Sequence, residues 1–243
     1  VKAEKKTEKP KKAPKPKAPV ELKDYGFVAV CMGKGITNIL KDLGVDRVIE
    51  GGQTMNPSTD DILKAVKRVK AKTVYVFPNN KNIIMAANQA AELVEDKKIV
   101  VIPSKSVPQC ISAMVEFNDK KSAEANEKAM NKAIGRVTSG QLTYAVRDTE
   151  IDGIEIKKDD ILGMVEGKIV TVGKDIDDVL NRVVSQMVDE DTEFLNVYYG
   201  KEIKKPQADV MLKALETKYA DDEIEVSFKK GGQPLYYYII SAE

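Results

Sequence analysis

The sequence predicts an α/β protein of two lobes, in which a parallel four-stranded β-α-β lobe precedes an α/β lobe with a mixed sheet. Up to residue 118, short continuous apolar runs alternate with helical periods, which is typical of β-α-β units and a parallel sheet. After Gly135 the pattern changes to alternating polar and apolar residues, which indicates antiparallel strands. The 243 residues are 42% hydrophobic, which supplies a core of this size.

Residues 1–24 are expected to form a linker. Residues 1–19 contain eight Lys and two Glu, and most of the others are Pro and Ala, so this segment has too little apolar surface to fold by itself. A polybasic contact with a membrane or with nucleic acid is the alternative interpretation. Since the sequence begins with Val rather than Met, we expect the chain to be a piece of a longer polypeptide with a folded part upstream. The two lobes are expected at 25–118 and 119–243.

The apolar runs and helical periods place the elements of each lobe. In the first lobe we expect strands at 27–32, 46–50, 73–78 and 98–103, and helices at 36–44, 60–70, 82–95 and 108–117. In the second we expect a polar helix at 119–135, strands at 193–200, 223–228 and 234–243, helices at 175–188 and 206–219, and a hairpin at 159–173 that turns at Glu166-Gly167. Residues 136–151 alternate as a strand does, with Arg147 and Asp148 as a solvent-facing ion pair.

Composition excludes several kinds of catalytic site. The sequence has no His, so neither a Ser-His-Asp triad nor a Cys-His pair forms within this chain. Cys31 and Cys110 are too few for a Cys-only metal site, and we expect no metal here. Both are interpreted as buried small hydrophobic residues of a reducing cytosol, with a bridge between them as the alternative.

Charge and hydropathy restrict the partners and the location. The formal charge is +1, of which +6 lies in residues 1–19, so the remainder carries −5 and does not resemble a nucleic-acid-binding domain. No apolar run approaches the ~20 residues that span a bilayer, and no signal peptide is present. We therefore expect a cytoplasmic chain without a transmembrane segment.

Two glycine-containing motifs have more than one interpretation. Gly33-Lys34-Gly35 joins a strand to a helix, where backbone N–H groups are able to hold an anion, but it lacks the spacing of a phosphate-binding loop. We favour a tight turn that lets the helix and the strand approach closely. Gly51-Gly52-Gln53 and Gly231-Gly232-Gln233 repeat one tripeptide, which is interpreted either as duplication or as two turns that need a positive φ.

Polar loops follow the strands of the first lobe. The carboxyl ends of parallel strands meet at one edge of a sheet, where open α/β sheets bind ligands. Each loop alone is explained by helix capping, and Ser58 with Asp61 has the spacing of a capping box. Together they predict a binding edge. Its candidate residues are Gly33, Lys34, Gly35, Asn56, Ser58, Asn79, Asn80, Lys81, Asn82, Ser104, Lys105 and Gln109. The alternative binding surface is the last strand, where Tyr236 and Tyr238 lie on the same side.

Four segments resemble one known family. They are GFVAVCMGKGITNILKDLGVDRVIEGGQTMNPSTDDIL, VFPNNKNIIMAANQAA, TYAVRDTEIDGIEIKKDDILG and GGQPLYYYIIS. The chain from about residue 25 to 243 resembles the C-terminal region of the bacterial fatty acid kinase catalytic subunit. That family is also described as dihydroxyacetone-kinase-like, or DhaL-domain, protein. The resemblance implies a two-lobed DegV-like fold that docks a separate fatty-acid-binding partner, itself a DegV-type protein, and that works with its own N-terminal kinase domains.

The resemblance also implies where the chemistry lies. In that family an N-terminal domain binds ATP through an Asp-rich magnesium site, and a middle domain carries His and Cys residues linked to phosphoryl transfer. Neither motif occurs here, so no catalytic residue and no cofactor are expected in this fragment, and ATP and magnesium are expected only in the missing N-terminal domain. The full-length chain is expected to be an ATP-dependent kinase that acts on a fatty acid carboxylate.

Three functions are consistent with the sequence. The first is a non-catalytic docking domain of a multidomain fatty acid kinase. The second is a small-ligand domain that binds a lipid or an anion between the lobes. The third is an independent enzyme that uses Lys34, Lys81 or Lys105, and the absence of His and of a nucleotide motif weighs against it.

Overall fold

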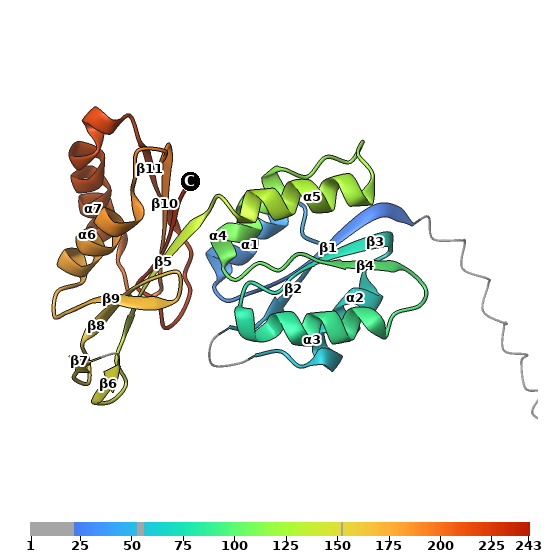
Figure 1. The fold of residues 1–243 in the computed structure, drawn as a ribbon, viewed down its shortest axis with the longest axis horizontal. Helices are drawn as coiled ribbons and strands as arrows, with labels where there is room; N and C mark the ends of the chain where they lie inside the picture. The colour runs from blue at the N-terminus through green and yellow to red at the C-terminus, as the bar shows by residue number, and fades with distance from the viewer. Residues whose placement is uncertain (1–21, 53–55, 152) are drawn as a thin grey trace, which may run out of the picture.

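Each of the two lobes is built on a sheet of its own (Figure 1), as the sequence predicts. The structure, a computed structural model, describes residues 22–52, 56–151 and 153–243. Most of the predicted linker lies outside these residues. The first strand begins at Lys23, two residues before the predicted start of the first lobe.

The first lobe is a parallel sheet with the strand order β2-β1-β3-β4. Its elements are β1 (Lys23–Cys31), α1 (Lys34–Asp42), β2 (Arg47–Glu50), α2 (Thr59–Arg68), β3 (Ala71–Phe77), α3 (Lys81–Glu92), β4 (Lys98–Val101), α4 (Val107–Val115) and α5 (Ala123–Ile134). The four predicted strands and their helices are confirmed. The apolar residues of β1 run without interruption because both faces of the sheet are covered by helices.

Two apolar layers cover this sheet. On one face Val28 and Val74 pack with Ile62 of α2 and Ile83 of α3. The layer on the other face is formed by α1, α4 and α5, and its buried residues include Phe77 of β3.

The predicted boundary at 118/119 assigned the polar helix α5 to the second lobe, and the structure packs it on the first. Met130 of α5 is fully buried in the core of the first lobe. The hydroxyl of Tyr75 in β3 donates a hydrogen bond of 3.0 Å to the Ala123 carbonyl at the start of the helix. Sequence pattern alone could not place the helix, because a few apolar residues on one face do not say which lobe they contact.

The second lobe is a six-stranded mixed sheet with the order β11-β10-β12-β5-β8-β9. Its elements are β5 (Thr138–Tyr144), β6 (Thr149–Ile151), β7 (Ile154–Ile156), β8 (Ile161–Val165), β9 (Lys168–Gly173), α6 (Ile176–Met187), β10 (Phe194–Tyr199), α7 (Lys205–Lys218), the short 3-10 helix η1 (Ala220–Asp222), β11 (Glu225–Lys230) and β12 (Tyr238–Ala242). Within the described sheet, β10 and β11 pair in parallel and the other neighbours are antiparallel, and the two helices cover one face.

The other face of the second sheet packs on the first lobe. Along β12, Tyr238 and Ile240 belong to the core beneath α6 and α7, whereas Ile239 belongs to the core of the first lobe. Tyr198 of β10 also lies in the first-lobe core. Successive side chains of these strands point to opposite faces of the sheet. One set packs beneath α6 and α7, and the other set forms an apolar layer that the two lobes share.

In this lobe the hairpin turn was predicted correctly, whereas the strand that starts near residue 136 was predicted too long. The β8–β9 hairpin turns at Glu166 and Gly167, both of which have a positive φ, as predicted. The alternating run from residue 136 ends at Tyr144, so the placement of Arg147 and Asp148 in a strand is wrong. Asp148 instead accepts a hydrogen bond from the Lys158 N–H, next to the β6–β7 hairpin, which sequence analysis missed.

The last strand is shorter than predicted. It starts at Tyr238, because residues 234–237 form a connection in which Leu235 has a φ of 70°. That connection passes along the border between the lobes, where the candidate site lies.

Candidate functional site

The carboxyl ends of the first-lobe strands face the second lobe. The predicted loops follow these strands as expected from a parallel sheet, but the second lobe covers part of the edge. Among the candidate residues, Ser104, Asn80 and Gln109 are buried. The exposed members are Lys34, Asn56, Ser58, Lys81, Asn82 and Lys105. Some candidate residues at this edge therefore lie in the cleft between the lobes, and others lie on the open surface.

The Gly33-Lys34-Gly35 turn is occupied by a loop of the second lobe. The Gly231 carbonyl accepts hydrogen bonds from the N–H groups of Gly35 (2.9 Å) and Ile36 (3.1 Å), so it caps the start of α1. Gly33 has a φ of 98°, and a Cβ on Gly35 would lie 1.7 Å from the Lys230 carbonyl oxygen. The turn is tight, but the element that approaches it is the second Gly-Gly-Gln loop and not, as predicted, the strand and the helix that the turn joins. Gly232 has a φ of 65°, and Gln53 lies outside the described residues.

Asn79 and Ser104 tie the ends of three strands together. The Asn79 Nδ2 atom donates to the Val30 carbonyl of β1 (2.9 Å), and the Ser104 hydroxyl, which follows β4, donates to Asn79 Oδ1 (2.6 Å). The Asn79 N–H in turn donates to Ser104 Oγ. Asn79 has a φ of 55°, a conformation that Asn tolerates better than most residues. These two side chains have a structural role.

Three other candidate or neighbouring residues are helix caps. Asn80 accepts from the Asn82 N–H (2.9 Å) at the start of α3, and Ser106 accepts from the Gln109 N–H (3.3 Å) at the start of α4. Ser58 and Asp61 form the predicted capping box, and the hydrogen bond from the Ser58 hydroxyl lowers the pKa of Asp61.

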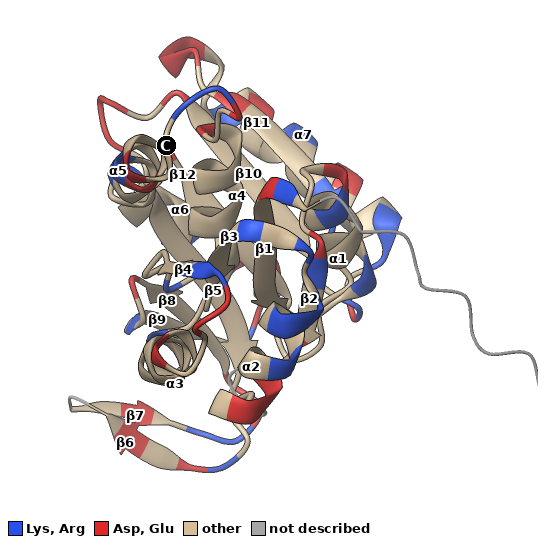
Figure 2. Cartoon of the chain, turned by 90° about the vertical axis from the view of Figure 1, so that its right-hand side faces the viewer, with Lys and Arg blue, Asp and Glu red and all other residues tan. Residues whose placement is uncertain are grey.

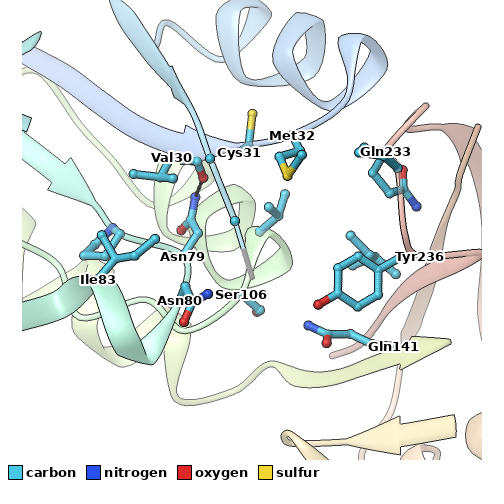
Figure 3. A pocket seen from close by; sticks show the side chains of 16 residues that line it. Val30, Cys31, Met32, Asn79, Asn80, Ile83, Ser106, Gln141, Gln233 and Tyr236 are labelled. Carbon is cyan, nitrogen blue, oxygen red and sulfur yellow. Dashed lines mark hydrogen bonds between the residues drawn. The ribbon is translucent and has the colours of Figure 1, made fainter. Parts of the chain in front are cut away.

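The inner cavity is a space of about 60 Å³ between the lobes. The first lobe lines it with Val30, Asn79, Asn80, Ile83 and Ser106 among others, and the second lobe with Gln141, Gln233, Tyr236 and Ile239. In Figure 3, Tyr236 and Gln141 extend from the second lobe toward Asn80 and Ser106. Gln233 is 2% exposed; its Nε2 donates to the Tyr198 carbonyl (2.7 Å), while its Oε1 has no partner among the described residues.

The outer cavity adjoins the inner one and measures about 170 Å³. It shares Asn80, Ser106 and Gln141 with the inner cavity. Its other lining residues are Lys81, Lys105, Gln109, Ser139, Met164, Glu166 and Gly167. The hydroxyls of Ser106 and Ser139 lie 2.7 Å apart and join the two lobes at its wall.

The cleft therefore brings together part of the predicted set. Asn79, Asn80, Lys81, Lys105 and Gln109 line the two cavities. Asn56 lines neither and lies in a hollow beside β2 and α2. Ser106 belongs to one of the polar loops predicted at this edge, whereas Gln141, Gln233 and Tyr236 were not predicted as cleft residues. The Gly-Gly-Gln repeat pointed to Gln233, but no pattern in the sequence singled out Gln141.

The two cysteines of the described residues are buried, and no metal-binding cluster is found there. Burial raises the pKa of the Cys31 and Cys110 thiols, so both stay protonated and free near neutral pH. Nowhere in the described residues do three or more His, Cys, Asp or Glu side chains gather as a metal site. Nor does any helix in the described ranges combine the length and apolarity needed to cross a membrane.

Basic residues gather on another side of the molecule. Figure 2 shows Lys and Arg over α1, β2 and α2. They line two open hollows beside β2, and include Lys34, Lys41, Arg47, Lys64 and Arg68. Asp46, Glu50 and Asp61 line the same hollows, so charges of both signs are mixed there. Such a mixture differs from the single-sign basic surface of nucleic-acid-binding domains.

Comparison with known families gives a match over nearly the whole described chain. Residues 26–243 match the FakA-like C-terminal family, which takes its name from a component of fatty acid kinase. Protein YloV of Bacillus subtilis (strain 168) is 49% identical over 225 residues, which cover 93% of this chain and 40% of that protein. An uncharacterized protein of Staphylococcus aureus (strain USA300) is 44% identical over 229 residues, or 94% of this chain and 41% of that protein. The chain thus spans about two fifths of the length of these relatives.

Solved structures share the fold at low sequence identity. DegV, a fatty acid binding protein from Bacillus subtilis, has a TM-score of 0.62 and 12% identity, covering 90% of this chain and 99% of that one. The dihydroxyacetone kinase of C. freundii has a TM-score of 0.61 and 11% identity, covering 90% and 48%. The Streptococcus pneumoniae fatty acid kinase (Fak) B3 protein loaded with linoleic acid has a TM-score of 0.53 and 10% identity, covering 90% and 99%. The chain therefore has a DegV-like fold.

Proposed function

Because the chain belongs to the FakA-like C-terminal family of fatty acid kinases, we propose that it is the non-catalytic docking domain of a multidomain fatty acid kinase. In this proposal it binds a fatty-acid-carrying DegV-type protein, so that an ATP domain elsewhere in the polypeptide phosphorylates the acyl carboxylate. The relation to fatty acid kinase follows from the family match, and the DegV-like fold follows from the structural neighbours.

The size of the inner cavity is the observation that carries the proposal. A cavity of about 150 Å³ holds one benzene ring, and the inner cavity measures about 60 Å³. Tyr236, Gln141 and Ile239 of the second lobe line it against the first lobe. The inner cavity by itself is too small for a long acyl chain, which supports a domain that acts on an acid carried by another protein.

The side chains that line the cleft also support a chain that does not itself bind ATP. ATP with magnesium requires carboxylate ligands and a phosphate-binding loop. The residues that line the two cavities include one carboxylate, that of Glu166, and the Gly33-Lys34-Gly35 turn is occupied by Gly231. These residues do not fit the nucleotide, which we propose binds in another part of the full protein.

The outer face of α3 offers a docking surface next to the polar loop that precedes it. Asn82, Met85, Gln89 and Leu93 follow at intervals of three or four residues, so they share one face of the helix. Met85 is 69% exposed and Leu93 is 61% exposed. Eight residues of helix separate these two apolar side chains by about 12 Å. We call these four residues the α3 stripe and propose that the DegV-type carrier contacts it.

Isothermal titration of the chain with a fatty-acid-loaded DegV-type protein from the same genome tests the proposal. Met85→Glu is expected to weaken binding by at least tenfold, or about 1.4 kcal/mol. Its melting temperature should stay unchanged, because the side chain is mostly exposed. The matched control is Val210→Glu on α7, where Val210 is 64% exposed, and it should leave the affinity unchanged.

The outcomes of this titration separate the surface from the function. Binding that is lost in the α7 variant and retained in the α3 variant would move the interface to the second lobe. A wild-type chain that does not bind the loaded carrier at all would overturn the docking function.

A further inference from the structure

We propose that an open hollow on the second lobe binds the Pro-x-x-Pro sequence of a second copy of this chain, Pro16-Lys17-Ala18-Pro19. This inference goes beyond docking of a carrier and does not depend on it. The hollow measures about 410 Å³, and all the residues that line it belong to the second lobe. We call it the tyrosine hollow.

Two tyrosines form the aromatic part of this hollow. The rings of Tyr144, at the end of β5, and Tyr237, just before β12, have centroids 6.0 Å apart and planes inclined by 56°. Both side chains are half-buried, and Pro234 lines the hollow with them. Pro-x-x-Pro segments bind in grooves lined by aromatic residues, because the extended polyproline helix forms at a low cost in conformational entropy. The tyrosine pair therefore points to a proline-rich peptide.

Hydrogen bonds hold the wall of the tyrosine hollow in a fixed shape. The Tyr236 N–H donates to the Pro234 carbonyl (2.8 Å), which closes a γ-turn around Leu235. Leu235 has a φ of 70°, which belongs to the rare and strained form of this turn. The Thr143 hydroxyl of β5 donates to the Leu235 carbonyl (2.7 Å) and ties the turn to the sheet. A wall that is already in place before the peptide arrives lowers the cost of binding.

The charges of the tyrosine hollow complement a lysine-rich peptide. Asp159 and Glu202 line it, and neither carboxylate forms an ion pair with a described residue. Lys201 also lines it, so two negative charges face one positive charge. Burial raises the pKa of Tyr237, and the charges of Glu202 and Asp159 raise it further. Residues 10–19 contain four Lys and no acidic residue, which suits this surface.

The length of the chain makes the occupant a second copy. Pro19 precedes Lys23 by four residues, which span at most about 14 Å. From Lys23, β1 extends for about 26 Å before it ends at Cys31. Figure 1 shows the second lobe on the side of that end. The motif of one chain therefore cannot reach its own tyrosine hollow, whereas the hollow of another copy is open to it.

Paramagnetic relaxation between two differently labelled copies tests this contact. A 15N-labelled chain is mixed with an unlabelled copy in which Ala13→Cys is modified with a nitroxide. Cys31 and Cys110 are buried, so the reagent modifies only the new thiol. Because the nitroxide and the 15N label are on different chains, broadening reports contact between copies. We expect the amide signals of Tyr144 and Tyr237 to lose most of their intensity as the concentration of the nitroxide copy rises.

Variants of the nitroxide copy test whether the motif itself is recognised. Pro16→Ala Pro19→Ala keeps every lysine and should abolish the broadening. The matched control Pro10→Ala Pro14→Ala keeps the Pro-x-x-Pro sequence and should leave the broadening unchanged.

Variants of the 15N-labelled copy test the surface. Asp159→Asn Glu202→Gln should weaken the broadening at Tyr144 severalfold, and both side chains are exposed, so the fold should be retained. The matched control Glu216→Gln Asp221→Asn removes two other exposed carboxylates of the second lobe and should have no effect.

Each outcome decides the proposal. Broadening that is absent, that lies on another surface, or that persists in Pro16→Ala Pro19→Ala would overturn it. Equal weakening by the two carboxylate variants would also overturn it, because attraction between net charges would then explain the contact. The mixture contains no carrier protein, so failure of this test would leave the docking function untouched.

Discussion

Asn80 both caps a helix and lines the cleft between the lobes. Its side chain is 5% exposed, caps α3 through the Asn82 N–H and lines both cavities. Two of the three Asn residues in the 79–82 loop therefore have structural roles, since Asn79 joins strands and Asn80 caps a helix. Lys81 and Asn82 are the exposed members of this loop, and their role in binding stays a prediction.

Removing the cap should lower stability. Asn80→Ala is expected to reduce the free energy of unfolding by about 1 kcal/mol, because the Asn82 N–H loses its acceptor. Urea denaturation monitored by circular dichroism measures this change. Asn82→Ala is the control and should stay within about 0.5 kcal/mol of wild type, because the Asn82 side chain is exposed. Equal stability of the two variants would show that the cap contributes nothing.

At the scale of elements, the most constrained contact is between two glycine loops. Residues 33–35 open α1 and residues 231–233 leave β11, and the Gly231 carbonyl accepts two N–H groups of the first lobe. The Gly35 position faces the backbone of Lys230 at a distance that leaves no space for a side chain. The two loops therefore fix the contact between the lobes at one side of the cleft.

A methyl group at this contact should separate the loops. Gly35→Ala is expected to lower the free energy of unfolding by about 1–3 kcal/mol, as overpacking of a tight site does. Thermal unfolding by calorimetry measures the loss. Gly135→Ala is the control, because a Cβ there meets its nearest atom at 3.4 Å and φ is −76°. A Gly35→Ala chain as stable as the control would contradict the described contact.

The first lobe could be predicted more completely than the second for a physical reason. Strands buried on both faces, such as β1 and β3, contain continuous apolar runs that reveal them in the sequence, although β1 begins four residues before its predicted start at residue 27. In the second lobe, alternation continued past Tyr144 into an exposed loop, and the strand was predicted too long. Patterns of one segment also do not reveal its neighbour, which is why α5 was assigned to the wrong lobe.

The candidate site shows the same limit. Parallel topology placed the loops that follow the strands at one edge of the sheet, and this part follows from sequence. The second lobe covers that edge through Gln141, Gln233 and Tyr236, which lie far away in the chain. Only the folded structure brings these residues to Asn80 and Ser106.

At the scale of the whole molecule, the shared core explains why the cleft is narrow. Tyr198 and Ile239 of the second sheet are buried in the core of the first lobe. The sheets are therefore held against each other by apolar packing as well as by the Ser106–Ser139 contact. A DegV-like fold closed in this way keeps two small cavities, of about 60 and 170 Å³, at the place where its lobes meet.

Native mass spectrometry tests most directly whether the domain binds the carrier or the acid. The chain is mixed in one sample with a free long-chain fatty acid and in another with a DegV-type protein loaded with the same acid. We expect no adduct between the chain and the free acid, because the inner cavity is too small, and a complex with the loaded carrier that retains the acid. A chain that holds the fatty acid by itself and forms no complex with the loaded carrier would contradict the docking function.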